Sequence, residues 1–92
     1  MAVRHSTINH AGQTPTSVTL SADVSQVAVL NRHATANVWV RVDGTDPEVD
    51  GDDTYVVPPG SRRVLEVTTA GATVVKLRAD AGVTDVEVEV EG

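Results

Sequence analysis

The chain has 92 residues, a net charge of −6 and no cysteine, so we expect one small domain without disulfides or thiolate chemistry. Its apolar residues are mostly valine and only two residues are aromatic, which favours strands over helices. No apolar run reaches the length of a membrane span, and the N-terminus lacks the apolar core of a signal peptide, so we expect no membrane association.

The charge is unevenly distributed along the chain. Residues 1–42 contain three arginines and one aspartate, whereas residues 43–92 contain four basic residues and twelve carboxylates. An acidic body repels phosphate groups, so binding to nucleic acid is not expected. The basic N-terminal part also contains all three histidines, and its charge suits an acidic protein surface.

Residues 1–16 are predicted to form an extended N-terminal arm, because they show no sustained period and Gly12 and Pro15 interrupt them. The alternative is that this segment adds a strand to the edge of the chain's own sheet. The arm is basic and Ile8 offers an apolar anchor, which suits docking to a partner. The candidate partner contacts in the arm are Arg4, His5, Ile8 and His10.

Residues 17–92 are predicted to form the folded domain. Short runs of alternating or β-branched residues, separated by turn signals every eight to twelve residues, predict strands and no helix. The expected strands are residues 17–20, 26–31, 34–42, 55–57, 62–67, 73–79 and 84–91. This pattern is typical of a small antiparallel β-sandwich, Ig-like or jelly-roll-like, whose strand order the sequence does not give.

The strand at residues 34–42 alternates between an apolar face and a polar face that carries Trp39 and Arg41. A tryptophan on a polar face indicates either an interface or a residue that the domain itself covers. On the interface interpretation, Trp39 and Arg41 are further candidate partner contacts, because large aromatic residues are enriched at binding hot spots.

The last expected strand alternates valines with carboxylates. Val86, Val88 and Val90 are expected to face the core, and the acidic side chains between them to face outward. Those carboxylates are suited to cross-strand ion pairs with Arg62, Lys76 or Arg78.

The loop at residues 43–53 is rich in acidic side chains: Asp43, Asp46, Glu48, Asp50, Asp52 and Asp53. Its start resembles an EF-hand loop, but Val57 stands where the bidentate glutamate is required and the flanking segments are strands. We therefore expect a turn-forming loop and no obligatory metal, although calcium binding in another geometry stays open.

No residue set in the chain is typical of catalysis. The Gly-x-Ser-x-Gly motif is absent, His5 and His10 lie in the arm, and His33 lies in a turn. We expect neither an enzyme nor a cofactor. Sugar binding by small β-sandwiches usually needs several exposed aromatic rings, and only Trp39 and Tyr55 are available here.

Four runs of the sequence carry a resemblance to a known group of proteins. They are Val38-Trp-Val-Arg-Val-Asp-Gly-Thr-Asp-Pro, Gly51-Asp-Asp-Thr-Tyr-Val-Val-Pro-Pro-Gly, Arg63-Val-Leu-Glu-Val and Thr73-Val-Val-Lys-Leu. Together, across residues 34–77, they resemble small capsid decoration and minor head proteins of tailed phages that infect actinobacteria. The motifs are strand and turn patterns rather than catalytic signatures.

The resemblance implies a virion structural protein made in the host cytoplasm and located on the head surface. Its implied partners are the major capsid protein and other copies of the chain, and its implied role is to stabilise the capsid lattice as a decoration, or cement, protein. A tail or head–tail connector component, or a module that binds carbohydrate or a cell surface, is the alternative function.

Overall fold

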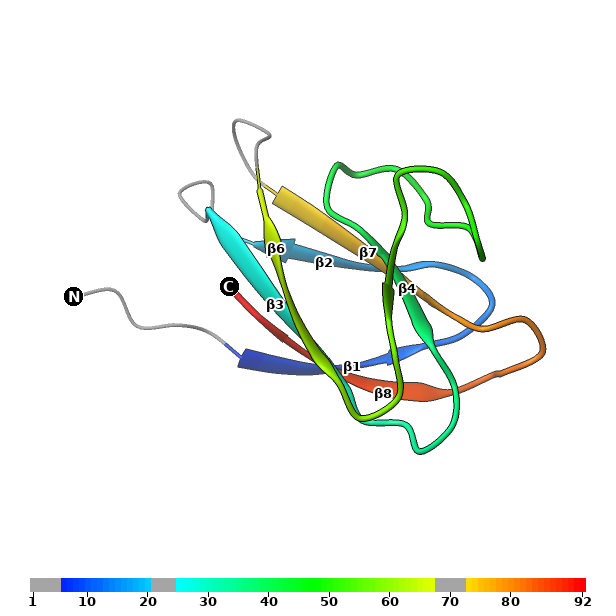
Figure 1. Ribbon diagram of the computed structural model, residues 1–92. Coiled ribbons are helices and arrows are strands. Elements are labelled where there is room, and N and C mark those ends of the chain that lie inside the picture. The colour runs from blue at the N-terminus through cyan, green and yellow to red at the C-terminus, as the bar shows by residue number, and fades with distance from the viewer. Residues whose placement is uncertain (1–5, 21–24, 68–72) are drawn as a thin grey trace.

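The structure, a computed structural model, describes residues 6–20, 25–67 and 73–92 (Figure 1). These residues form eight strands and no helix, which confirms the predicted all-β class. The described part of the chain accordingly offers no apolar helix that could cross a membrane. The strands are β1 (Ser6–Ala11), β2 (Thr16–Leu20), β3 (Gln26–Asn31), β4 (Val38–Arg41), β5 (Tyr55–Val57), β6 (Arg62–Glu66), β7 (Thr73–Ala79) and β8 (Val86–Glu91).

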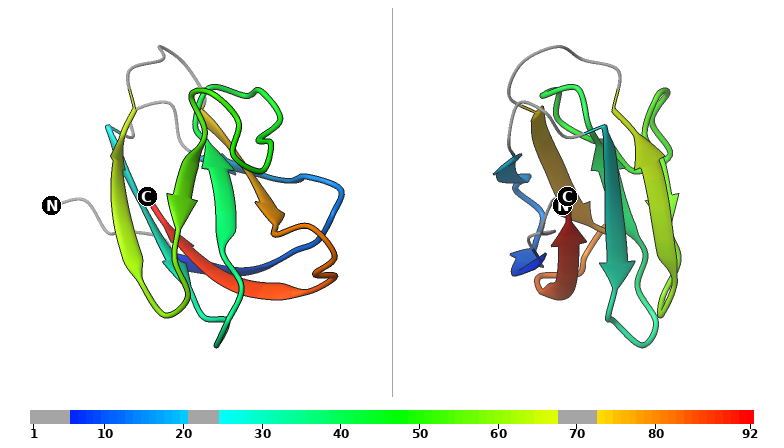
Figure 2. Two further views of the ribbon diagram at one scale, coloured as in Figure 1. Left: turned by 45° about the vertical axis from the view of Figure 1, so that its right-hand side comes forward. Right: turned by 90° about the vertical axis from the view of Figure 1, so that its left-hand side faces the viewer.

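The strands form two four-stranded antiparallel sheets that pack face to face (Figure 2). Sheet A has the order β1-β8-β3-β6, and sheet B has the order β2-β7-β4-β5. Strands at equal distances from the middle of the chain pair with each other, so β1 pairs with β8, β2 with β7, β3 with β6 and β4 with β5. This long ribbon folds over so that β8 also pairs with β3 and β7 with β4. The connectivity is that of a jelly roll rather than an immunoglobulin sandwich.

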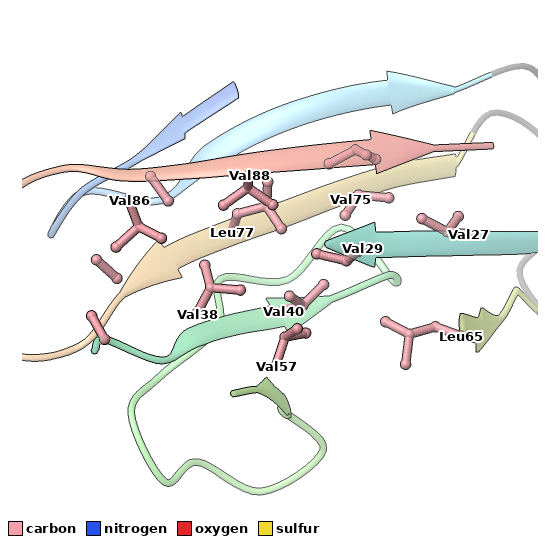
Figure 3. Packing of buried hydrophobic residues seen from close by; sticks show 14 residues of the cluster. Val27, Val29, Val38, Val40, Val57, Leu65, Val75, Leu77, Val86 and Val88 are labelled. Atoms are coloured by element: carbon pink, nitrogen blue, oxygen red, sulfur yellow. The ribbon is translucent and has the colours of Figure 1, made fainter. Parts of the chain in front are cut away.

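The core lies between the two sheets and consists largely of valine (Figure 3). Period-2 alternation places Val86, Val88 and Val90 of β8 in it, each at most 1% exposed, as the sequence predicts. Leu65 of β6 and Leu77 of β7 are the two leucines of the buried cluster. Because β-branched valine fits a pleated surface and loses little side-chain freedom there, the composition and the fold agree.

The N-terminal segment differs from the prediction of an arm at residues 1–16. Ser6–Ala11 is strand β1, which pairs along its whole length with β8, and Ala11 is 1% exposed in the core. The alternative interpretation, a strand added to the edge of the chain's own sheet, therefore describes residues 6–11. Residues 1–5, with Arg4 and His5, lie outside the described residues.

The strand expected at residues 34–42 is shorter than predicted, because β4 begins only at Val38. The preceding segment is a turn held by a side chain: Nδ1 of His33 accepts the backbone N–H groups of Thr35 at 3.0 Å and Ala36 at 2.9 Å. These bonds satisfy the backbone N–H groups of Thr35 and Ala36 within the turn. The chain therefore joins the hydrogen-bond ladder of sheet B only after the turn ends.

Asn31, at the end of β3, is fully buried and connects the two sheets. Its Nδ2 donates to the carbonyl oxygens of Ala36 at 2.7 Å and Val57 at 2.9 Å, on the sheet B side. Its Oδ1 accepts the backbone N–H of His33 at 2.9 Å. The amide thus satisfies three backbone groups in the interior, where an unpaired polar group is costly.

Candidate functional site

The predicted partner contacts do not form one surface. Ile8 and His10 lie on β1 with side chains on the outer face of sheet A, because Ala11 and the alternate positions face the core. Trp39 and Arg41 lie on β4, opposite the core valines, and therefore on the outer side of sheet B. Because β1 and β4 belong to different sheets, which form the two layers of the sandwich (Figure 2), the two pairs of residues are on opposite sides of it.

Trp39 is 8% exposed in the isolated chain, so little of its indole is available to a partner. Its Nε1–H donates to Oδ1 of Asp80 at 2.7 Å. In the single chain, the alternative of a tryptophan that the domain itself covers therefore describes Trp39, and its role as a partner contact stays a prediction. The period-2 argument gave the correct sheet face but not what covers it.

Asp80, just after β7, is a structural residue that the sequence analysis did not single out. Its carboxylate accepts the Trp39 indole and, through Oδ2, the backbone N–H of Asn37 at 2.8 Å. Its backbone oxygen accepts Nε2 of Gln13 at 2.6 Å. Asp80 thereby connects the end of β7, the entry to β4 and the β1–β2 turn. No local signal predicts this, because the partners are 41 to 67 residues away in sequence.

Arg41 is engaged within its own chain rather than free for a partner. Its guanidinium forms a two-point contact with the Asp43 carboxylate, with Nε 3.1 Å from Oδ1 and Nη2 on Oδ2. Nη1 donates to the backbone oxygen of Asp52 at 3.1 Å. Arg41 therefore holds the start and the end of the acidic loop together.

The hydrogen bond from Arg41 holds the pKa of the Asp43 carboxyl well below its usual range; partial burial opposes this shift, and the backbone N–H of Thr45 reinforces it. A carboxyl with a lowered folded-state pKa stabilises the fold above its unfolded-state pKa of about 4, and this contribution is lost as the pH falls below that value. We expect the parent protein to lose more unfolding free energy between about pH 7 and about pH 2 than Asp43→Asn does.

Urea denaturation at both pH values measures this difference. Arg41→Gln, like Asp43→Asn, should lose less unfolding free energy on acidification than the parent does, because it removes the charge that lowers the pKa of Asp43. Equal acid sensitivity of the parent and Asp43→Asn would contradict the assignment.

The acidic loop consists of turns, as predicted. Asp50 and Asp53 have φ values of 56° and 59°, in the left-handed region that aspartate tolerates better than most residues. One of its carboxylates, Asp46, contacts Lys76 Nζ of β7 at 2.9 Å, which fixes the loop to sheet B. Among the described residues, no three His, Cys, Asp or Glu side chains are grouped so as to hold a metal ion.

The outer face of sheet A carries alternating charged and apolar residues. Cross-strand neighbours place Ile8 beside Glu89 and Leu30 beside Arg62 in one row, and Ala28 beside Val64 in the next. Ile8 and Val64 are each 48% exposed, among the most exposed large apolar side chains of the described residues.

The carboxylates of β8 on this face are ion-paired across strands. Arg32 contacts Glu87 at 3.0 Å and Glu89 at 3.7 Å, and Arg62 contacts Glu91 at 3.8 Å. The expected pairing with Arg62 is therefore present. Of the other two expected cations, Lys76 pairs with the acidic loop, and Arg78 donates to Gln13 Oε1 at 3.0 Å. At the edge of the same face, His10 Nδ1 lies 2.7 Å from Asp85 Oδ1.

The other aromatic residue, Tyr55, is 40% exposed at the start of β5. The guanidinium carbon of Arg63 lies 4.9 Å from the centre of its ring, in the geometry of a cation–π contact. Arg63 also donates to the backbone oxygen of Val56 at 3.0 Å, so it joins the β5 and β6 edges. One face of the tyrosine ring is thus occupied, and Trp39 is buried, which leaves little aromatic surface for stacking on a sugar.

Comparison with protein-family models, curated proteins and solved structures found no match to this chain.

Proposed function

We propose that the chain is a phage virion structural protein that decorates the outer surface of the head, contacts the major capsid protein and stabilises the capsid lattice. Its action is binding alone. A protein that binds the assembled lattice and not the free subunits stabilises the lattice by mass action. The resemblance of residues 34–77 to small head proteins supports this proposal.

The observation that carries the proposal is the outer face of sheet A. This broad face presents Ile8 at 48% exposure beside ion-paired charges, with His10 on the same edge strand. An exposed apolar residue within a polar rim is the usual anatomy of a protein–protein contact. Jelly rolls occur in viral capsid proteins but also in lectins and cupins, so the fold agrees with the proposal by analogy alone.

Substitution of Ile8 by aspartate tests the proposed docking face. Ile8 is outward on an edge strand, so Ile8→Asp should fold like the parent, with a melting temperature within a few degrees. Removing an anchor at an interface and burying a charge there should weaken head binding by about tenfold or more. Thr19→Asp, an exposed position on β2 of sheet B, is the matched control and should bind as the parent does.

Binding is measured by co-sedimentation with heads of the encoding phage that were purified without the protein. Removal of residues 1–5 takes away Arg4 and His5 but no part of β1, so it tests these two predicted contacts separately. Deletion of residues 1–14 would instead remove β1 and the buried Ala11. If Ile8→Asp binds heads as well as the parent does, the outer face of sheet A is not the docking surface. Binding of the parent to tails but not to heads would favour a tail component.

A further inference from the structure

β6 is an edge strand with a regular backbone. It pairs with β3 on one side, and the strand order of sheet A gives it no neighbour on the other (Figure 2). Its register with β3 runs from Arg62 to Glu66 without a skipped residue, so the edge contains no bulge. It contains no proline either. Bulges and prolines are two of the devices by which natural proteins prevent pairing at sheet edges.

The hydrogen-bond pattern shows which backbone groups of β6 point outward. The amide of Asn31 donates to the oxygen of Ser61 and the amide of Val67 donates to the oxygen of Ser25, both at 2.9 Å. In an antiparallel ladder the bonded pairs alternate, so the odd-numbered residues of β6 bond to β3 and the even-numbered residues direct their N–H and C=O groups away from the sheet. Within the described residues, these outward groups have no backbone partner.

We propose that β6 pairs antiparallel with β6 of a second copy of this chain, across a two-fold axis at Val64. The two copies of sheet A then become one continuous sheet of eight strands. This dimer goes beyond the proposed head binding and does not depend on it.

Charge complementarity selects the second copy as the occupant. In a register centred on Val64, Arg62 lies opposite the partner subunit's Glu66, and the symmetry forms the same pair twice. Opposite charges directly across an antiparallel pair are stabilising, and like charges are destabilising. Arg62 contacts Glu91 only at 3.8 Å and its side chain is 50% exposed, so its remaining N–H groups can reach a second carboxylate. Glu66 accepts Nε2 of Gln26 at 3.0 Å and retains a second carboxylate oxygen.

The centre of this register is apolar. Val64, 48% exposed in the single chain, lies opposite the partner subunit's Val64, and Ala28 of β3 lies beside it on the same face. Val64 is also one of the residues whose N–H and C=O point outward, so the two copies exchange both hydrogen bonds at the axis. Side-chain pairing and backbone pairing therefore require the same register.

Two of the other edge strands, β1 and β5, fit a second copy less well. On β1, the outward oxygen of His10 already accepts Thr16 Oγ1 at 3.1 Å. On β5, which has three residues, the oxygens of Val56 and Val57 already accept Arg63 and Asn31. The side chain of Arg63 in β6 contacts the Tyr55 ring and the backbone oxygen of Val56. It therefore does not cover the outward N–H and C=O groups of β6.

Disulfide trapping tests the position of the axis. The chain has no cysteine, so Val64→Cys introduces a single thiol. Hydrogen-bonded antiparallel pairs have Cα atoms about 5.5 Å apart, within the range that a disulfide spans. Mild oxidation of dilute protein should convert Val64→Cys to a covalent dimer. Ile8→Cys, which has the same exposure on another edge strand, should stay largely monomeric. Equal trapping of both variants, or trapping only at Ile8, would overturn the proposal.

A charge exchange tests the register independently. Sedimentation equilibrium of the full chain should show a dimer of twice 9.6 kDa. Arg62→Glu places like charges opposite each other at two symmetric positions and should weaken the dimer about tenfold. Adding Glu66→Arg should restore it, although the contact with Glu91 stays lost. The control Arg32→Ser removes ion pairs on the same face away from the edge and should leave the dimer unchanged. A parent chain that is monomeric at its highest soluble concentration, or a double variant as weak as Arg62→Glu, would refute the pairing.

Discussion

Replacing Trp39 with alanine should lower the free energy of unfolding by about 3–5 kcal/mol, the usual cost of removing a large buried aromatic side chain. The indole is 8% exposed, and its Nε1–H donates to Asp80. Its loss leaves a cavity over sheet B and takes one donor from the Asp80 carboxylate. A domain of this size typically has only about 5–15 kcal/mol of stability, so the melting temperature should fall by on the order of 15 °C or more.

Trp39→Phe separates the two contributions. It retains most of the ring but cannot donate to Asp80, so its destabilisation should be smaller than that of the alanine variant yet measurable. Thr19→Ala on the exposed face of β2 is the control and should stay within about 0.5 kcal/mol of the parent. Thermal and urea unfolding give these values. A Trp39→Ala protein that melts with the parent and fails only to bind a partner would restore the interface interpretation.

Asn31→Asp should destabilise the fold by about 3–5 kcal/mol near neutral pH, although the two side chains have nearly the same shape. Nδ2 of Asn31 donates to two carbonyl oxygens, at 2.7 and 2.9 Å, in a fully buried site. An ionised carboxylate would face those oxygens without a proton to donate, and an uncompensated buried charge is among the most costly changes in a protein interior.

Asn31→Leu distinguishes loss of the hydrogen bonds from burial of a charge. It leaves the backbone groups of His33, Ala36 and Val57 without their partner, which costs about 1–3 kcal/mol for each group that stays unsatisfied. Gln26→Glu, an exposed amide on the same strand, should cost less than about 1 kcal/mol. Chemical denaturation of the four proteins under one condition makes the comparison. If Asn31→Asp is as stable as Gln26→Glu, the connection between the sheets contributes little.

Trp39 and Asn31 also show why sequence patterns do not predict the long-range contacts of the candidate site. Alternation places Trp39 on the correct face, but the acceptor of its indole N–H is Asp80, 41 residues further along the chain. For Asn31, the sequence predicts only the end of the strand at residues 26–31. Its role depends on two carbonyl groups that reach it from the sheet B side of the sandwich. Neither relation leaves a local signal in the sequence.

By itself, the sequence determined the all-β class, seven of the eight strands and the core face of β8, because valine-rich alternation acts through the local geometry of a pleated strand. It also determined that the acidic loop is built from turns, since glycine and aspartate act within a few residues. Only the tertiary structure decided the strand order, the burial of Trp39 and the formation of a strand by Ser6–Ala11. Ser6–Ala11 has little apolar periodicity. It forms a strand because the backbone of β8, about 80 residues away, supplies the partners of its ladder hydrogen bonds.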